Sequence, residues 1–172
     1  MKRIKKLLQR YSGIKTMIML FALIMIANIL LFPVFMPAGD SLRPLDLMFG
    51  SAPEVTFKMI SAYGDEGRQN YLQGLLLLDF IYPVIYSLFL AFSLYRLYQN
   101  VLLSLSPVLI LLSDYIENAG IIIMLLSWPE EMNVIAYTTC FFTSMKWVLA
   151  GLIIFLITAG LLRRGIHLLK TL

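Results

Sequence analysis

The chain has 172 residues, of which 60% are hydrophobic and 14% are charged, and its formal net charge is +4. A typical soluble domain carries about 25% charged residues, so this composition argues against a soluble domain and predicts a membrane protein. One cysteine and one histidine exclude an internal disulfide and provide no ligand set for zinc, haem or a Ser–His–Asp triad. We therefore predict neither a metal nor a cofactor.

The first predicted span follows a basic segment, "MKRIKKLLQRYSGIK". The apolar run at 16–36 has the length of about 20 residues that crosses a hydrocarbon core. A basic segment before an apolar run is also typical of a signal peptide. However, this run exceeds the usual apolar region of about 7–15 residues, and no small-residue cleavage site follows it. We therefore predict a retained transmembrane helix that ends near Pro33 and Pro37.

Three more apolar runs of spanning length follow, at about 71–95, 101–126 and 134–162. Because backbone groups in lipid must satisfy their hydrogen bonds internally, each run is predicted to be a helix. Pro83 is predicted to kink the second of them. The sequence thus predicts an all-α polytopic membrane protein, with a single domain over 1–172 built as a bundle of four transmembrane helices.

The only long segment between predicted spans, about 37–70, contains "APEVTFKMISAYG". Val55, Met59 and Ala62 recur in it at helical spacing. This pattern predicts a short amphipathic helix that lies on the outer surface or caps the bundle. An irregular loop with one helical turn is the alternative.

Lysine and arginine are distributed unevenly around the predicted spans. Three of them, Arg43, Lys58 and Arg68, lie in the 37–70 segment, whereas the other side has Lys2, Arg3, Lys5, Lys6, Arg10, Lys15, Arg96, Arg163, Arg164 and Lys170. The positive-inside rule therefore predicts a cell (inner, cytoplasmic) membrane protein with both termini in the cytoplasm. The basic flanks are expected to bind anionic lipid rather than nucleic acid.

Polar side chains occur at helical spacing inside three of the predicted spans. They are Asp79, Tyr82 and Tyr86 in the second span, Asp114, Glu117 and Asn118 in the third, and Thr139, Thr143, Lys146 and Trp147 in the fourth. Counting residues along each span places Asp79 in the outer third, Asp114 and Lys146 near the middle, and Glu117 slightly outward of the middle. We therefore predict that they converge in the outer half of the bundle.

Four of these side chains, Asp79, Asp114, Glu117 and Lys146, are ionisable. On insertion scales such a group costs about 2.5–3.5 kcal/mol at the bilayer centre, so we predict that all four face inward and contact one another. One lysine neutralises one carboxylate, so the remaining acids must hold a proton, bind a cation or recruit a further positive group, for which Arg68 is the nearest candidate. The alternative is that these groups only cross-link helices, but interhelical hydrogen bonds average about 0.6 kcal/mol, too little to offset the insertion cost.

Three motifs, "GRQNYLQGLLLLDFIYPVIY", "DYIEN" and "MKW", together with four predicted spans, resemble a group of small four-helix membrane proteins of bacteria and archaea. The resemblance covers 67–147 and implies a fold but no activity. The architecture is also similar to the EXPERA superfamily, which includes emopamil-binding protein, a sterol isomerase. That likeness implies a helical bundle with acidic residues in a membrane cavity for a lipophilic substrate. The isomerase motif does not carry over, because the predicted bundle contains no histidine.

Three functions fit these features: binding or chemical modification of a lipid-like amphiphile, proton- or cation-coupled transport by a homodimer, and a regulatory or assembly role in a membrane complex. If the protein modifies the amphiphile chemically, Asp114 and Glu117 would act as the acid and the base of the reaction. Lys146 would then form an ion pair with the ionised one of these two carboxylates. The other ligand-binding residues would be Asp79, Tyr82, Tyr86, Asn118, Thr143, Trp147 and Arg68. Transport is an alternative because buried acids mark many ion pathways through membranes.

Overall fold

In this computed structural model, residues 1–35 and 42–169 are described, and every regular element among them is a helix. The elements are α1 (Lys2–Tyr11), α2 (Ile14–Ile26), the π-helix η1 (Ala27–Leu31), α3 (Phe32–Phe35), the 3₁₀-helix η2 (Leu45–Leu47), α4 (Pro53–Ala62), α5 (Gly64–Leu77), α6 (Tyr82–Tyr98), α7 (Val101–Leu105), α8 (Pro107–Ser127) and α9 (Asn133–Leu169). The predicted all-α class is therefore confirmed for the described residues. Met36 and Lys170, which the sequence assigned to the first span and the C-terminal tail, lie outside them.

Within residues 1–35 and 42–169, three continuous helical segments are long and apolar enough to cross a membrane. They are Ile14–Phe35, Val101–Ser127 and Asn133–Ile166, and they lie where the sequence predicts the first, third and fourth spans. The last of them belongs to α9, which at about 1.5 Å per residue is about 55 Å long. It extends past the predicted end near residue 162 because no proline interrupts it.

The second predicted span, 71–95, is wrong as a single helix. The structure instead has two helices, α5 and α6, bent by 48° at a short break. Pro83 lies in the first turn of α6, and a proline ring there displaces the carbonyl four residues earlier, that of Asp79, from helical bonding. The sequence thus predicts a kink at the right place, and the structure opens it into an unwound turn.

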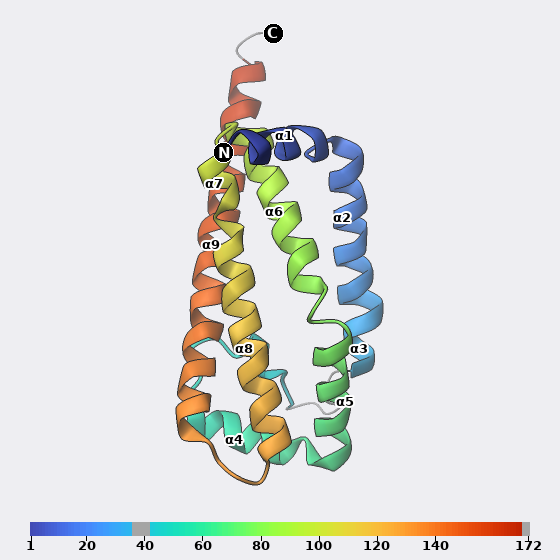
Figure 1. The fold of residues 1–172 in the computed structure, drawn as a ribbon, viewed down its shortest axis with the longest axis vertical. Helices are drawn as coiled ribbons and strands as arrows, with labels where there is room; N and C mark the ends of the chain where they lie inside the picture. The colour runs from blue at the N-terminus through green and yellow to red at the C-terminus, as the bar shows by residue number, and fades with distance from the viewer. Residues whose placement is uncertain (36–41, 170–172) are drawn as a thin grey trace.

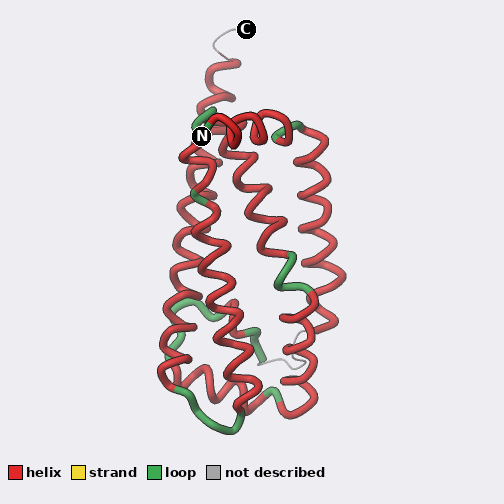
Figure 2. Tube along the Cα trace, in the orientation of Figure 1, coloured by secondary structure: helices red, strands yellow, loops and turns green. Residues whose placement is uncertain are grey.

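The helices run alongside one another, with α8 and α9 paired closely and α6 beside both (Figure 1). Helix α2 packs mainly against α6 and stands at the edge of the molecule. Helix α1 crosses one end, and α4 crosses the other. Among the described residues, the non-helical segments lie at these two ends, at the α5–α6 break, between α7 and α8, and around η2 (Figure 2).

Helix α4 forms where the sequence predicts a short helix, but the face that packs on the bundle is not the one that carries Val55, Met59 and Ala62. Val55 and Ala62 are exposed, whereas Phe57 and Ile60 are buried in a core cluster with residues of α5, α8 and α9. Thr56 also faces inward, since it is buried and its Oγ1 lies 3.4 Å from Cys140 Sγ of α9. The buried face therefore runs through Phe57 and Ile60, and α4 caps the bundle.

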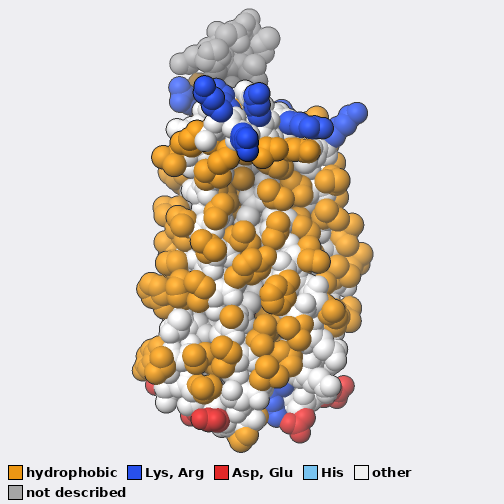
Figure 3. Space-filling view, in the orientation of Figure 1, with side chains coloured by type: hydrophobic (Ala, Val, Ile, Leu, Met, Phe, Trp, Pro, Cys, Tyr) orange, Lys and Arg blue, Asp and Glu red, His pale blue; other side chains and the backbone are white. Residues whose placement is uncertain are grey.

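Side-chain chemistry divides the surface into zones (Figure 3). Hydrophobic side chains cover the lateral surface, Lys and Arg gather where α1 crosses, and Asp and Glu gather where α4 crosses. We refer to these as the basic end and the α4 end. The spans have this surface because their outward side chains are apolar, as expected of helices that contact lipid.

Gly120 allows α8 to approach α9 closely. A Cβ atom at this position would lie 2.0 Å from Thr139 Oγ1 and 3.2 Å from Thr139 Cβ. Gly120→Ala is therefore expected to lower the free energy of unfolding by about 1–3 kcal/mol through overpacking, measured by denaturation in lipid nanodiscs. Gly151→Ala is the matched control, because a Cβ there meets no atom within 4 Å; equal effects of the two substitutions would contradict the close approach.

Candidate functional site

Lys146 of α9 forms ion pairs with two carboxylates of α8. Its Nζ lies 2.6 Å from Glu117 Oε2 and 3.5 Å from Asp114 Oδ1. The exposed fraction is 0% for Glu117, 6% for Asp114 and 8% for Lys146. The i, i+3 spacing of the two acids directs both side chains to one face of α8, and the tight α8–α9 packing brings the lysine to that face.

Three neutral side chains complete this cluster. Thr143 Oγ1 donates a 2.8 Å hydrogen bond to Glu117 Oε1, and the Tyr86 hydroxyl donates to Asp114 Oδ2. The Asn118 amide nitrogen donates to Asp114 Oδ1 at 3.2 Å. The carboxylates of α8 are thus held by groups from α6, α8 and α9, so their positions are fixed from three helices.

The Thr143 hydroxyl is expected to stabilise the buried Glu117 carboxylate. Thr143→Val retains the shape but removes the donor, and a hydrogen bond to a charged group contributes about 1.5–3 kcal/mol. We expect a loss of stability of that size in nanodisc denaturation. Thr138→Val is the matched control, because the exposed Thr138 hydroxyl bonds only the Val134 carbonyl of its own helix. A Thr143→Val protein as stable as the control would show that this contact contributes little.

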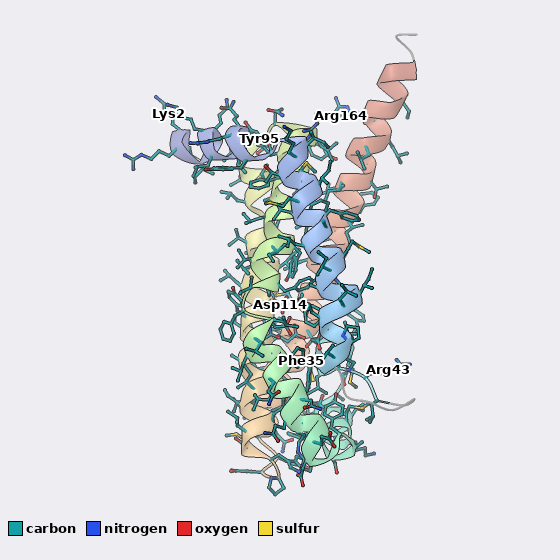
Figure 4. The ribbon with its side chains drawn as sticks, turned by 90° about the vertical axis from the view of Figure 1, so that its right-hand side faces the viewer. Lys2, Phe35, Arg43, Tyr95, Asp114 and Arg164 are labelled. Carbon is teal, nitrogen blue, oxygen red and sulfur yellow. The ribbon has the colours of Figure 1, made fainter. Side chains whose placement is uncertain are left out.

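The cluster lies well inside the molecule along its length. At about 1.5 Å per residue, Lys146 is about 20 Å from the start of α9 and about 26 Å from Arg163 at the basic end. Figure 4 shows Asp114 between the two ends of the bundle, among the helices. The site is therefore nearer the α4 end than the basic end.

Asp79 lies in the unwound turn between α5 and α6, beside this cluster. Because this turn is not helical, the Asp79 carbonyl is free to accept a hydrogen bond from the Asn118 amide nitrogen, at 3.4 Å. The Asn118 amide thus bridges Asp79 and Asp114. Its own Oδ1 is buried and receives no hydrogen bond from any described residue. The site therefore contains an unused acceptor next to two acids.

A further acid, Asp46 of η2, is part of the site although no pattern in the sequence indicates it. Its Oδ1 accepts a 2.6 Å hydrogen bond from the Tyr71 hydroxyl, and its carbonyl accepts one of 3.0 Å from Trp147 Nε1. Asp46 and Asp79 line one small cavity of about 20 Å³, together with the rings of Phe32, Phe35 and Tyr71. Neither acid forms an ion pair with a described basic residue.

Some predicted site residues make other contacts. The Tyr82 hydroxyl accepts a 2.7 Å hydrogen bond from the Asn28 side chain of η1, which is not part of the cluster. Trp147 is 42% exposed, and Lys146 Nζ lies 5.8 Å from its ring centroid. The Tyr86 hydroxyl, in contrast, belongs to the cluster, because it donates to Asp114 Oδ2.

The sequence offered Arg68 as the further positive group of the site, and the structure contradicts this. Arg68 forms an ion pair with Asp65 and lies over the Trp128 ring. The physical reason is distance along α5: Arg68 is eleven residues before Asp79, which is about 16 Å of helix. It therefore belongs to the α4 end and does not neutralise the buried acids.

The fold and the site together define a helical membrane protein with a lysine ion-paired to two carboxylates in its interior. No group of three or more His, Cys, Asp or Glu residues within 1–35 and 42–169 could hold a metal ion. No protein-family model, curated protein or solved structure matches the chain. The resemblances drawn from the sequence motifs therefore stay predictions.

Proposed function

We propose that this protein is a four-span protein of the cell membrane, with both termini in the cytoplasm, that binds a lipid-like amphiphile by a cationic end. The bent pair α5–α6 would form the second of the four spans. The gathering of Lys and Arg at one end (Figure 3) supports the orientation. The site would then lie in the outer half of the bundle.

The observation that carries this proposal is the excess of acid over base in and beside the interior, where Asp114 and Glu117 are buried and Asp46 and Asp79 are partly buried. Asp114 and Glu117 share one lysine, and Asp46 and Asp79 lie beside them without an ion-pair partner among the described residues. Uncompensated charge is costly at this depth. A ligand ammonium group would supply the missing positive charge, and its N–H groups could donate to acceptors such as Asn118 Oδ1.

The cavity beside Asp46 and Asp79 suits the polar tip of such a ligand. At about 20 Å³ it has room for a group near the size of one water. Three aromatic rings line it, and aromatic faces attract cations. A whole drug-sized molecule requires about 300–1,000 Å³, so the hydrocarbon tail of the ligand would lie outside, along Phe32 and Phe35 at the lipid-facing surface.

A binding comparison tests this function. The full-length protein in phosphatidylcholine nanodiscs would be titrated with dodecylamine and with a neutral glycerol ether of the same chain length, followed by native mass spectrometry. We expect the amine to bind at least about tenfold more tightly, because a hydrogen bond to a charged group adds about 1.5–3 kcal/mol. Equal retention of the two amphiphiles would contradict a cation site.

A second candidate function is proton- or cation-coupled transport by a homodimer, and the broken span at Asp79 favours it. Discontinuous helices near the membrane centre form the binding sites of many transporters. In proteoliposomes with a pH gradient, efflux of a lipophilic cation would fall several-fold in Glu117→Gln and stay unchanged in Glu130→Gln, which alters an exposed acid. An absence of flux in the unmodified protein would count against transport.

A further inference from the structure

Helix α1 is a separate element at the basic end, and it lies crosswise to the spans (Figure 4, with Lys2 at its far end). Leu8 is 5% exposed and packs with Leu20, Phe92 and Tyr95. The chain turns at Ser12, whose carbonyl accepts a hydrogen bond of 3.3 Å from Arg96. Helix α1 is therefore docked on the bundle in a fixed direction.

The faces of α1 differ sharply in chemistry. Leu8 and Ile4 face the bundle, whereas Leu7 and Tyr11 are 55% and 44% exposed and lie at the edge of the same apolar face. The opposite face and both its flanks carry exposed polar residues, which are Lys2, Arg3, Lys5, Lys6, Gln9 and Arg10. A basic polar face beside an apolar edge is typical of a helix that lies in the plane of a membrane surface.

The charge at this end has one sign. Besides α1, the basic end has four exposed or partly exposed cationic side chains, those of Lys15, Arg96, Arg163 and Arg164. No acidic side chain of the described residues lies in α1, the first turn of α2 or the last turns of α6 and α9. Charge complementarity therefore calls for an anionic partner. The apolar edge favours a lipid surface over a soluble polyanion, because exposed leucine and tyrosine side chains gain by leaving water.

We propose that α1 is a docking surface for anionic phospholipid head groups. Its lysine and arginine side chains bind the phosphates, while Leu7 and Tyr11 insert at the boundary between head groups and acyl chains. The amphiphile site around Lys146 lies about 26 Å along α9 from Arg163 at the basic end. A test of lipid binding on α1 can therefore fail while the amphiphile site stands, and the reverse.

Spin-label depth measurements test the placement of α1. Cys140, the only cysteine, would be replaced by serine, and labels would be placed at Leu7→Cys and, on the opposite face, Gln9→Cys. In phosphatidylglycerol nanodiscs we expect the Leu7 label to be accessible to oxygen and shielded from a water-soluble relaxant, and the Gln9 label to show the reverse. Equal water accessibility of the two labels would overturn the proposal. The proposal would also be overturned if, in neutral lipid, the Leu7→Cys label were shielded from the water-soluble relaxant and its spectrum showed spin–spin broadening. That result would indicate that a second copy of the chain covers this face.

A charge-matched comparison tests the lipid chemistry. Lys5→Gln/Lys6→Gln and Arg43→Gln/Lys58→Gln each remove two exposed positive charges, the first pair from α1 and the second from the α4 end. The variants would be compared in nanodiscs of mixed phosphatidylglycerol and phosphatidylcholine by native mass spectrometry. For Lys5→Gln/Lys6→Gln, we expect the retained phosphatidylglycerol to fall about fivefold for each charge removed. The Arg43/Lys58 variant should match the unmodified protein. Equal losses in both variants, or none in either, would contradict a head-group surface on α1.

Discussion

Lys146→Met is expected to destabilise the protein by about 3–5 kcal/mol, because it leaves two buried carboxylates without their cation. Glu117 and Asp114 are nearly inaccessible to solvent, so water cannot replace the ammonium group. Methionine has a similar length and adds no clash. Denaturation of the protein in lipid nanodiscs measures the change in the free energy of unfolding.

Lys58→Met provides the control for this substitution, because Lys58 is exposed on α4 and forms no ion pair with a described residue. The control should leave stability unchanged. If Lys146→Met were as stable as Lys58→Met, the carboxylates would not depend on the lysine, and the ion pairs would not stabilise the fold.

Asp79→Asn and Asp46→Asn are each expected to weaken binding of a cationic amphiphile by about tenfold or more, since a hydrogen bond to a charged group contributes about 1.5–3 kcal/mol. Both acids line the aromatic cavity and neither has a described ion-pair partner. The asparagine variants keep the size of the side chain, remove its charge and replace one carboxylate oxygen with an amide NH2 group. Titration of dodecylamine against each variant in nanodiscs, read by native mass spectrometry, measures the loss.

Asp65→Asn removes an equal charge from an acid whose side chain is fully exposed at the α4 end. Its affinity for the amine should equal that of the unmodified protein. A similar fall in all three variants would indicate attraction by overall charge instead of a site. Unchanged affinity in Asp79→Asn and Asp46→Asn would remove the two acids from the ligand site.

The contact between the α8 acids and Lys146 was predictable from sequence because it depends on helix geometry. The i, i+3 spacing of Asp114 and Glu117 is local, and depth along an uninterrupted helix follows from counting residues. Lys146 could be matched to them because ionisable groups in a membrane interior must find partners. Whether these residues bind a ligand stays a prediction.

The surroundings of Asp79 were only partly predictable. Pro83 signals a kink, but not that the preceding turn unwinds and frees the Asp79 carbonyl for Asn118. Asp46 was missed altogether, because its partners Tyr71 and Trp147 lie 25 and 101 residues away in the chain. No local pattern encodes such long-range contacts.

The separate helix α1 had a signal in the sequence that the charge count obscured. Ile4, Leu7, Leu8 and Tyr11 recur at helical spacing among the lysines and arginines, which is the pattern of an amphipathic surface helix. A count of charges on each side of the membrane uses only the number of lysines and arginines in this segment and ignores the spacing of the apolar residues between them. Spacing and charge together would have located the helix.

A double-mutant cycle on Lys146 and Glu117 gives the most direct test that the buried ionisable groups form one network. Lys146→Met, Glu117→Gln and the double variant would be denatured in the same nanodiscs. For residues in contact, we expect the loss in the free energy of unfolding of the double variant to be smaller than the sum of the two single losses, by about 0.5–3 kcal/mol. Strict additivity would show that the two side chains do not interact, and the shared interior site would have to be abandoned.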